Sequence, residues 1–187
     1  VTPPVTPVMY LKRRLAMKAL LVIDMLKDFI DDDGVLTTGE AGKGLIGFIK
    51  EKIDEFRAQG DPVVFVCDNH EPDDKEFAMF TPHCIAGTPG SQVIDELEVR
   101  SGDKIIKKRR YSAFFGTDLD LYLREKVVDE LYLVGVCTNI CVLYTAADAR
   151  NLNYTVNIYE NGVASFDEEA HRFALKEAKN TLGCRIL

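Results

Sequence analysis

The stretch Leu131-Tyr-Leu-Val-Gly-Val-Cys-Thr-Asn-Ile-Cys141-Val142 contains the pattern that decides the fold. Its apolar run through residues 131–136 predicts a buried strand, and the small residues of 141–150 predict a helix directly after it. A cysteine at the start of a helix lies near free backbone N–H groups and the positive end of the helix dipole, which lower its pKa. Cys141 is therefore either a nucleophile or a buried structural cysteine.

Strand-like and helix-like segments alternate along the chain on both sides of this stretch. Strands are predicted at residues 19–23, 63–66, 104–106, 131–136, 155–159 and 184–187. Helices are predicted at residues 45–56, 119–126, 141–150 and 168–181. Apolar strands that alternate with amphipathic helices indicate an α/β fold, a three-layer αβα, doubly wound arrangement with a mainly parallel six-stranded sheet. The glycine-rich segment 39–44 is expected to be a flexible turn.

Length and composition limit the classes of protein to which this chain can belong. At 187 residues and 47% hydrophobic content, the chain can form one domain with a sizeable core, which we place at residues 17–187. A net charge of −7 argues against nucleic acid as a partner, and the apolar runs are too short to span a membrane. Five cysteines without a CxxC pair indicate free thiols and a cytoplasmic protein.

We expect residues 1–16, which are rich in Pro and Thr and then basic, to be a mobile N-terminal extension.

Polar residues follow several of the predicted strands. In a doubly wound sheet, ligands bind beyond the carboxyl ends of the strands, where the strand order reverses. Asp24 follows the first strand, Lys107 and Lys108 follow the third, and Cys141 follows the fourth. A carboxylate, a lysine and a cysteine on one rim are the groups that nucleophilic acyl transfer requires. Each has a plainer interpretation, because Asp24 could cap a turn and the lysines belong to a basic run that could be a solvated face.

A carboxylate and two imidazoles form a second group. Asp68 and His70 lie two residues apart at the end of the second strand, on one side of an extended chain, and His83 follows in a proline-flanked loop. This mixed oxygen and nitrogen set suits Zn, Fe or Mn, and Glu76 could supply a fourth ligand. Zinc is the metal we favour. The third histidine, His171, lies on the predicted C-terminal helix, where packing or capping is expected.

Together these segments resemble the isochorismatase-like cysteine hydrolases, and among them the nicotinamidases. The matching motifs are Val-Ile-Asp24-x4-Phe29, Asp68-x-His70, Pro82-His83-Cys-x-x-Gly87-Thr88, Lys108-x-x-Tyr-Ser-Ala-Phe114 and Gly135-Val-Cys-Thr-x-x-Cys141-Val. They occur in the family's order and span residues 17–187. Two positions depart from the nicotinamidase pattern, because Phe80 stands where a Trp is typical and Asn139 where an Asp is typical. Both departures bear on the substrate.

The resemblance implies a role for each group of residues. Asp24, Lys108 and Cys141 fall on the catalytic triad, which selects Lys108 over Lys107, and Asp68, His70 and His83 fall on the metal ligands. The backbone N–H groups of Cys137 and Cys141 would form the oxyanion hole, with a cis peptide bond between Val136 and Cys137. Phe29, Phe80 and Tyr111 would wall a substrate pocket by stacking, although ordinary core packing is the alternative for these aromatic side chains.

The resemblance therefore implies hydrolysis of a small-molecule amide through a thioester on Cys141. We expect nicotinamide to be the substrate, giving nicotinate and ammonia in pyridine-nucleotide salvage, and we expect a homo-oligomer. The alternatives are a related amide or carbamoyl-amide hydrolase with another substrate, and a catalytically idle member that binds a metal or ligand.

Overall fold

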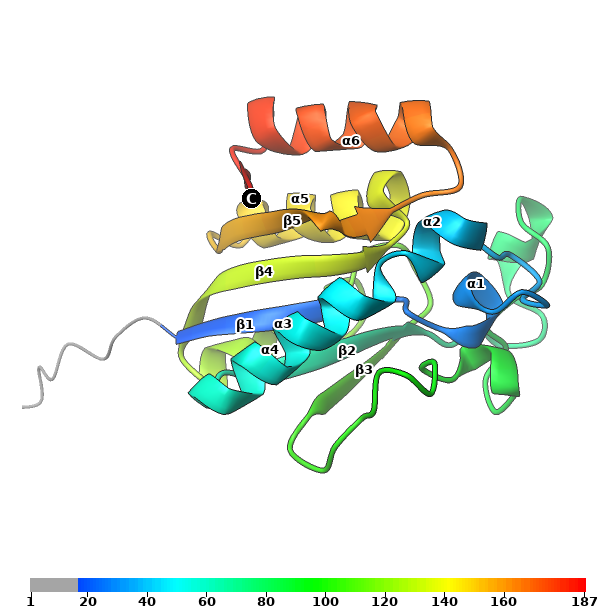
Figure 1. Cartoon of the computed structure of the whole chain (residues 1–187), viewed down its shortest axis with the longest axis horizontal. Helices are drawn as coiled ribbons and strands as arrows, with labels where there is room; N and C mark the ends of the chain where they lie inside the picture. Colours follow the sequence, from blue (N-terminus) through cyan, green and yellow to red (C-terminus); the bar gives the residue numbers. More distant parts are fainter. Residues whose placement is uncertain (1–16) are drawn as a thin grey trace, which may run out of the picture.

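Six parallel strands form the sheet that organises the protein (Figure 1). The computed structural model describes residues 17–187, and the extension expected at residues 1–16 lies outside this range. The strand order is β3-β2-β1-β4-β5-β6. The strands are β1 (Met17–Ile23), β2 (Val63–Asp68), β3 (Lys104–Lys108), β4 (Val128–Val136), β5 (Thr155–Ala164) and β6 (Arg185–Ile186). The predicted six-stranded, mainly parallel sheet is confirmed.

Helices cover both faces of the sheet because its central strands are apolar on both sides. The helices are α1 (Lys27–Ile30), α2 (Gly39–Lys43), α3 (Ile46–Gln59), α4 (Leu119–Glu125), α5 (Leu143–Asn151) and α6 (Glu168–Asn180). On β1, Leu20 and Val22 face the cluster that contains the buried residues of α3. Leu21 and Ile23 face the opposite cluster, which contains the buried residues of α4, α5 and α6. This alternation along one strand produces the three predicted layers.

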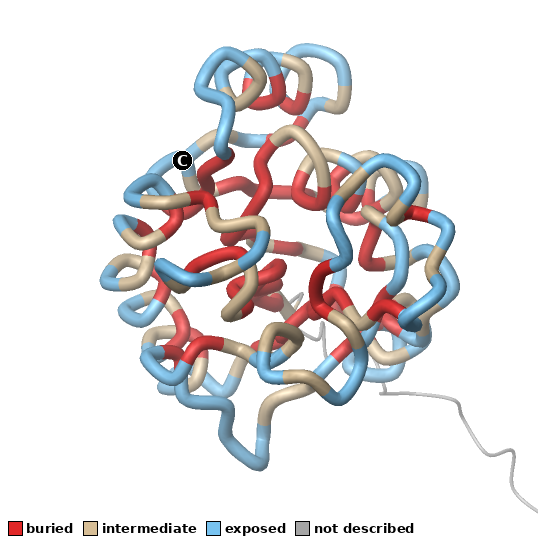
Figure 2. Tube along the Cα trace, turned by 90° about the vertical axis from the view of Figure 1, so that its right-hand side faces the viewer, coloured by how far each residue is buried: buried red, intermediate tan, exposed pale blue. Residues whose placement is uncertain are grey.

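The order of the strands reverses beside β1. From β1 the chain runs through β2 to β3 on one side of the sheet and continues through β4, β5 and β6 on the other. The carboxyl ends of β1 and β4 therefore flank the crevice in which such folds bind ligands. Figure 2 is turned to view the end of the sheet at which these strands finish, with the buried trace at the centre.

Strands β2 and β3 both continue past their predicted carboxyl ends, and this difference positions the polar groups. β2 continues to Asp68 and β3 to Lys108, and these two residues are register partners. An apolar pattern could not reveal this extension because the last residue of each strand is charged. Both side chains are buried, and Lys108 Nζ donates a hydrogen bond to Asp68 Oδ1, so each buried charge is compensated by the other.

One expectation about the loops is wrong. Segment 39–44 is not a flexible turn, because Gly39–Lys43 forms the short helix α2. Tertiary packing causes the difference. Thr38 is buried and donates a hydrogen bond to the Phe29 carbonyl at 2.8 Å. The Gly42 backbone lies so close to Thr38 and Ile30 that an added Cβ would overlap the Thr38 hydroxyl.

Within residues 17–187, none of the helices has the length and apolar character that a bilayer crossing requires.

The approach of β4 to β1 requires glycine at position 135, and this generates a prediction. Gly135 has a φ of 115°, and an added Cβ would lie 1.9 Å from the Ile23 carbonyl oxygen. The variant Gly135→Ala should lose at least about 2 kcal/mol of unfolding free energy in urea denaturation. The control Gly102→Ala, whose Cβ would meet nothing within 4 Å, should change it by less than about 0.5 kcal/mol. Equal stability of the two variants would contradict this reading.

Candidate active site

A buried lysine joins the ends of three strands. Lys108 Nζ lies 2.9 Å from Asp24 Oδ2 and 3.4 Å from Cys141 Sγ, and it also donates a hydrogen bond to Asp68 Oδ1. Asp24 directly follows β1 with a φ of 52°, and its Oδ1 accepts a hydrogen bond from the Asp68 backbone N–H at 2.9 Å. Lys107 is exposed, so the lysine beside Asp24 and Cys141 is Lys108. The structure thus brings the three predicted catalytic side chains into contact.

Cys141 is held within a turn rather than at the start of a helix. Residues Thr138–Val142 form one turn of π-helix that leads into α5, so helical structure begins three residues earlier than predicted. Single π turns occur frequently at functional sites. One ligand atom each from Asp24, Asp68 and Cys141 lie within 4.8 Å of one another.

The charges at this site correct the expectation of a resting thiolate. Burial raises the pKa of Cys141 well above its ordinary value. The neighbouring Asp24 and Asp68 carboxylates raise this pKa further, whereas the positive charge of Lys108 lowers it. Burial also raises the pKa of Asp24 to about 6, with a further contribution from Asp68. Burial opposes the charge on Lys108, but the carboxylates outweigh it and hold the Lys108 pKa well above its ordinary value. The site therefore contains a neutral thiol beside a carboxylate that can accept its proton near neutral pH.

The three predicted metal ligands also meet. Asp68 Oδ2 lies 3.7 Å from His70 Nε2 and 3.9 Å from His83 Nε2. A parallel bridge between His70 and Ile85 brings the loop with His83 alongside the end of β2. Glu76 Oε1 lies 4.0 Å from His70 Nε2, so the expected fourth candidate lies at the same place.

The surroundings of the two imidazoles fit a metal site. His83 Nδ1 lies 2.8 Å from the Thr81 carbonyl oxygen and His70 Nδ1 lies 3.1 Å from Asp74 Oδ2, so each Nδ1 has an acceptor to which it can donate. A proton on Nδ1 leaves the lone pair on Nε2, the atom that would bind a metal. His70 Nε2 is buried without a hydrogen-bond partner. A divalent metal with nitrogen and oxygen ligands would satisfy it.

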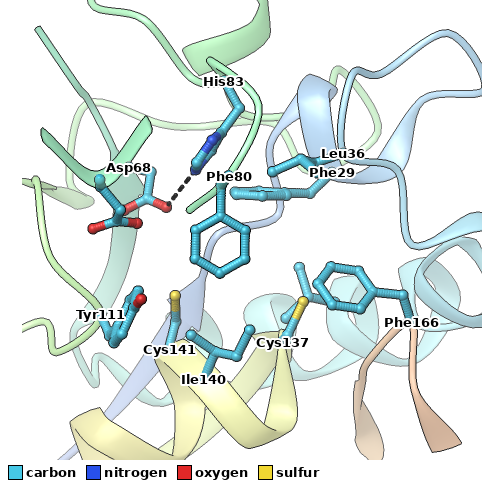
Figure 3. A pocket seen from close by; sticks show the side chains of 12 residues that line it. Phe29, Leu36, Asp68, Phe80, His83, Tyr111, Cys137, Ile140, Cys141 and Phe166 are labelled. Atoms are coloured by element: carbon cyan, nitrogen blue, oxygen red, sulfur yellow. Dashed lines mark ion pairs between the residues drawn. The ribbon is translucent and has the colours of Figure 1, made fainter. Parts of the chain in front are cut away.

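An apolar cavity opens beside both groups. It holds about 360 Å³ of empty space, counting the part open to solvent. Asp68 and His83 lie at one end, and the sulfur atoms of Cys137 and Cys141 lie along one wall (Figure 3). Its lining residues are Phe29, Leu36, Asp68, Glu76, Phe80, His83, Tyr111, Val136, Cys137, Ile140, Cys141 and Phe166.

The predicted pocket residues and the predicted oxyanion residues all reach this cavity. Phe29, Phe80 and Tyr111 line it, and the rings of Phe29 and Phe80 lie 5.4 Å and 6.2 Å from the His83 ring. The Val136–Cys137 peptide bond is cis, as the resemblance implies. The stacking and oxyanion roles themselves stay predictions.

Sequence reasoning missed several residues that shape the site. Asp28 Oδ2 accepts a hydrogen bond from the Cys84 backbone N–H at 2.7 Å and so fixes the residue next to His83. Asp74 contacts His70, and Leu36, Ile140 and Phe166 complete the cavity wall. Only the place of Asp28 inside the first quoted motif could have drawn attention to it. The other contacts depend on loop paths that the sequence pattern does not encode.

Comparison with known proteins agrees with this geometry. The family model described as the isochorismatase domain matches residues 18–186. The chain belongs to the isochorismatase family. Its members include hydrolases, and the fold and the cavity found here agree with such a protein.

Three solved structures illustrate the range of this family. The nicotinamidase/pyrazinamidase PncA from Bacillus subtilis is 41% identical, with a TM-score of 0.86 and coverage of 91% of this chain and 98% of that one. The N-carbamoylsarcosine amidase from Thermoplasma acidophilum is 38% identical (TM-score 0.83; 91% and 95% covered). The pyrazinamidase of Pyrococcus horikoshii, solved in complex with zinc, is 32% identical (TM-score 0.85; 91% and 98% covered).

The buried charge cluster generates a stability prediction that separates two adjacent lysines. Lys108→Met would leave Asp24 and Asp68 buried without their shared cation, so we expect a loss of about 3–5 kcal/mol of unfolding free energy. Lys107→Met removes the same charge from an exposed position and should change it by less than about 0.5 kcal/mol. Urea denaturation measures both variants. A Lys108 variant as stable as the Lys107 variant would contradict the shared-cation reading.

Proposed function

We propose that this isochorismatase-family protein is a cysteine amidohydrolase that converts nicotinamide and water to nicotinate and ammonia. The observation that carries the proposal is the contact of Lys108 with both Asp24 and Cys141 at the wall of an aromatic cavity. A nucleophile, a base and a cation in mutual reach are what acyl transfer from an amide requires.

The proposed reaction begins with the neutral thiol. Asp24 takes the proton as Cys141 Sγ bonds to the amide carbonyl carbon, because an acceptor with a pKa of about 6 is largely ionised at pH 7. Lys108 contacts both groups and balances the negative charge that develops on them. Asp24 then passes the proton to the amide nitrogen, the C–N bond breaks, and ammonia leaves behind a thioester on Cys141.

The second half of the reaction regenerates the thiol. Water attacks the thioester carbonyl carbon while Asp24 accepts a proton from it, the C–S bond breaks, and Asp24 returns that proton to Cys141 Sγ as the acid product leaves and ionises in solution. In each tetrahedral intermediate the oxyanion would accept hydrogen bonds from the backbone N–H groups of Cys137 and Cys141, two residues that line the cavity.

The metal group serves substrate binding in this proposal. Asp68, His70 and His83 would hold one divalent ion, for which zinc is our first choice, and its Lewis acidity would orient the ring nitrogen of the substrate. Phe29, Phe80 and Tyr111 would stack against the same ring. The ring would then lie between the metal end of the cavity and the Cys141 wall.

The charge of the cavity supports a neutral substrate over an anionic one. Among its lining residues, all within the described part of the chain, there is no arginine or lysine. The positive charges of Lys108 and a divalent ion would together be matched by the three carboxylates of Asp24, Asp68 and Glu76. No surplus positive charge is left to pair with the carboxylate of an N-carbamoyl amino acid. This favours nicotinamide over the substrate named for the Thermoplasma acidophilum relative.

Ammonia release from nicotinamide tests the proposal. The purified protein, supplied with zinc, should release it, and Cys141→Ala should lower the rate by at least about a thousandfold. Cys184→Ala removes another buried thiol, one that is not among the residues lining the cavity, and should keep the rate. With N-carbamoylsarcosine, kcat/KM should be at least about tenfold lower than with nicotinamide. Ammonia release from N-carbamoylsarcosine alone would contradict the nicotinamide proposal and indicate a carbamoyl-amide hydrolase. Release from neither compound would mean that the triad hydrolyses neither substrate.

Removal of the metal provides a separate test. Chelation should raise KM for nicotinamide and lower kcat/KM, because a template for the ring is lost, and added Zn²⁺ should restore both. His83→Ala should lower the metal content and mimic the chelated protein. Metal analysis alongside the assay links the two effects. Full activity of protein shown to be metal-free would contradict the proposed role.

A further inference from the structure

A carboxylate that is not among the predicted ligands lies behind the metal site. The Asp74 side chain is 3% exposed, and its Oδ2 lies 3.1 Å from His70 Nδ1, on the side of the ring away from Asp68. The same carboxylate accepts a hydrogen bond from the Glu76 backbone N–H at 3.0 Å through Oδ1. Asp74 therefore contacts one predicted ligand directly and fixes the backbone of another candidate.

An arginine side chain contacts both oxygens of the Asp74 carboxylate. Arg110 Nη1 lies 3.0 Å from Asp74 Oδ1 and 3.1 Å from Oδ2. Arg110 follows β3 two residues after Lys108, so this ion pair links the loop of Asp74 to the segment that carries the buried lysine. Nη1 contacts both oxygens, and each oxygen has a second partner in His70 Nδ1 or the Glu76 backbone N–H, so the carboxylate is held in one orientation.

We propose that Asp74, clamped by Arg110, is a positioning residue of the metal centre. Its Oδ2 accepts a hydrogen bond from the Nδ1–H of His70, which sets the tautomer and the ring orientation so that the Nε2 lone pair faces Asp68 and His83. A carboxylate behind a ligating histidine also makes that histidine a better ligand, and loss of such a partner typically costs 10- to 100-fold in metal affinity. The inference rests on the metal site of the proposed function.

The plainer role for Asp74 is that of a helix cap, and the contacts allow the two roles to be separated. Asp74 is the N-cap of the short 3₁₀ helix Lys75–Ala78, and the cap uses Oδ1. The contact with His70 uses Oδ2. Serine is a good N-cap residue, but its single oxygen cannot replace both contacts. The variant Asp74→Ser therefore keeps the cap and removes the histidine partner, whereas Asp74→Ala removes both.

The test measures zinc affinity of the full-length, metal-stripped protein by competition with a chromophoric chelator. Both Asp74→Ser and Asp74→Ala should bind Zn²⁺ about 10- to 100-fold more weakly than the wild type. Arg110→Gln should show a smaller loss, because the contact between Asp74 and His70 remains. Asp73→Ser changes the exposed neighbouring carboxylate in the same way and should bind as the wild type does. Circular dichroism of each metal-free variant checks that it is folded.

The outcomes distinguish this inference from the proposed function. If Asp74→Ser binds Zn²⁺ with wild-type affinity, the positioning role is overturned and Asp74 is only a helix cap. This holds whether or not Asp74→Ala binds Zn²⁺ more weakly. A wild type that binds no Zn²⁺ would overturn it as well. If the wild type binds Zn²⁺, the Asp74 variants bind it weakly and nicotinamide is not hydrolysed, the positioning role stands and the substrate proposal fails. Recovery of nicotinamide hydrolysis in Asp74→Ser at raised Zn²⁺ would place the defect in metal affinity, as expected.

Discussion

One buried ammonium group, shared by two carboxylates, is the constraint on which the site depends. Lys108 contacts Asp24 and Asp68, and all three side chains are withdrawn from water. Buried charges cost several kcal/mol each unless they are compensated, so the ends of β1, β2 and β3 must stay in register for the fold to be stable. Asp68 contacts Lys108 with one oxygen and faces His70 and His83 with the other. The triad and the metal ligands therefore form a single connected unit.

This arrangement changes how the cysteine is expected to react. A lone cysteine at a helix terminus would tend toward the thiolate, but burial and two nearby carboxylates raise the pKa of Cys141. The same burial raises the pKa of Asp24 to about 6, which makes it a stronger base than an exposed aspartate. The thiol and its base are thus adjusted by one environment, and proton transfer can accompany the attack.

The sequence predicted the parts of the molecule that depend on local pattern. Apolar runs located the six strands, and helical spacing located α3, α4, α5 and α6. The resemblance located the triad and the metal ligands, whose roles still await tests. Asp74 was not predicted, because its contacts with His70 and Arg110 depend on the path of a loop and on a segment 36 residues away. The helix α2 was missed because packing at Thr38, rather than intrinsic propensity, forms it.

The proposed mechanism requires that Cys141 forms a covalent bond to the substrate. Rapid acid quench of the wild type mixed with nicotinamide, followed by peptide mass spectrometry, tests it directly. We expect a transient nicotinoyl adduct on the peptide that contains Cys141, formed and lost at rates that match turnover. Cys137 lines the same cavity and serves as an internal comparison. Turnover with an adduct on Cys137, or with no adduct at any time before the steady state, would contradict the account.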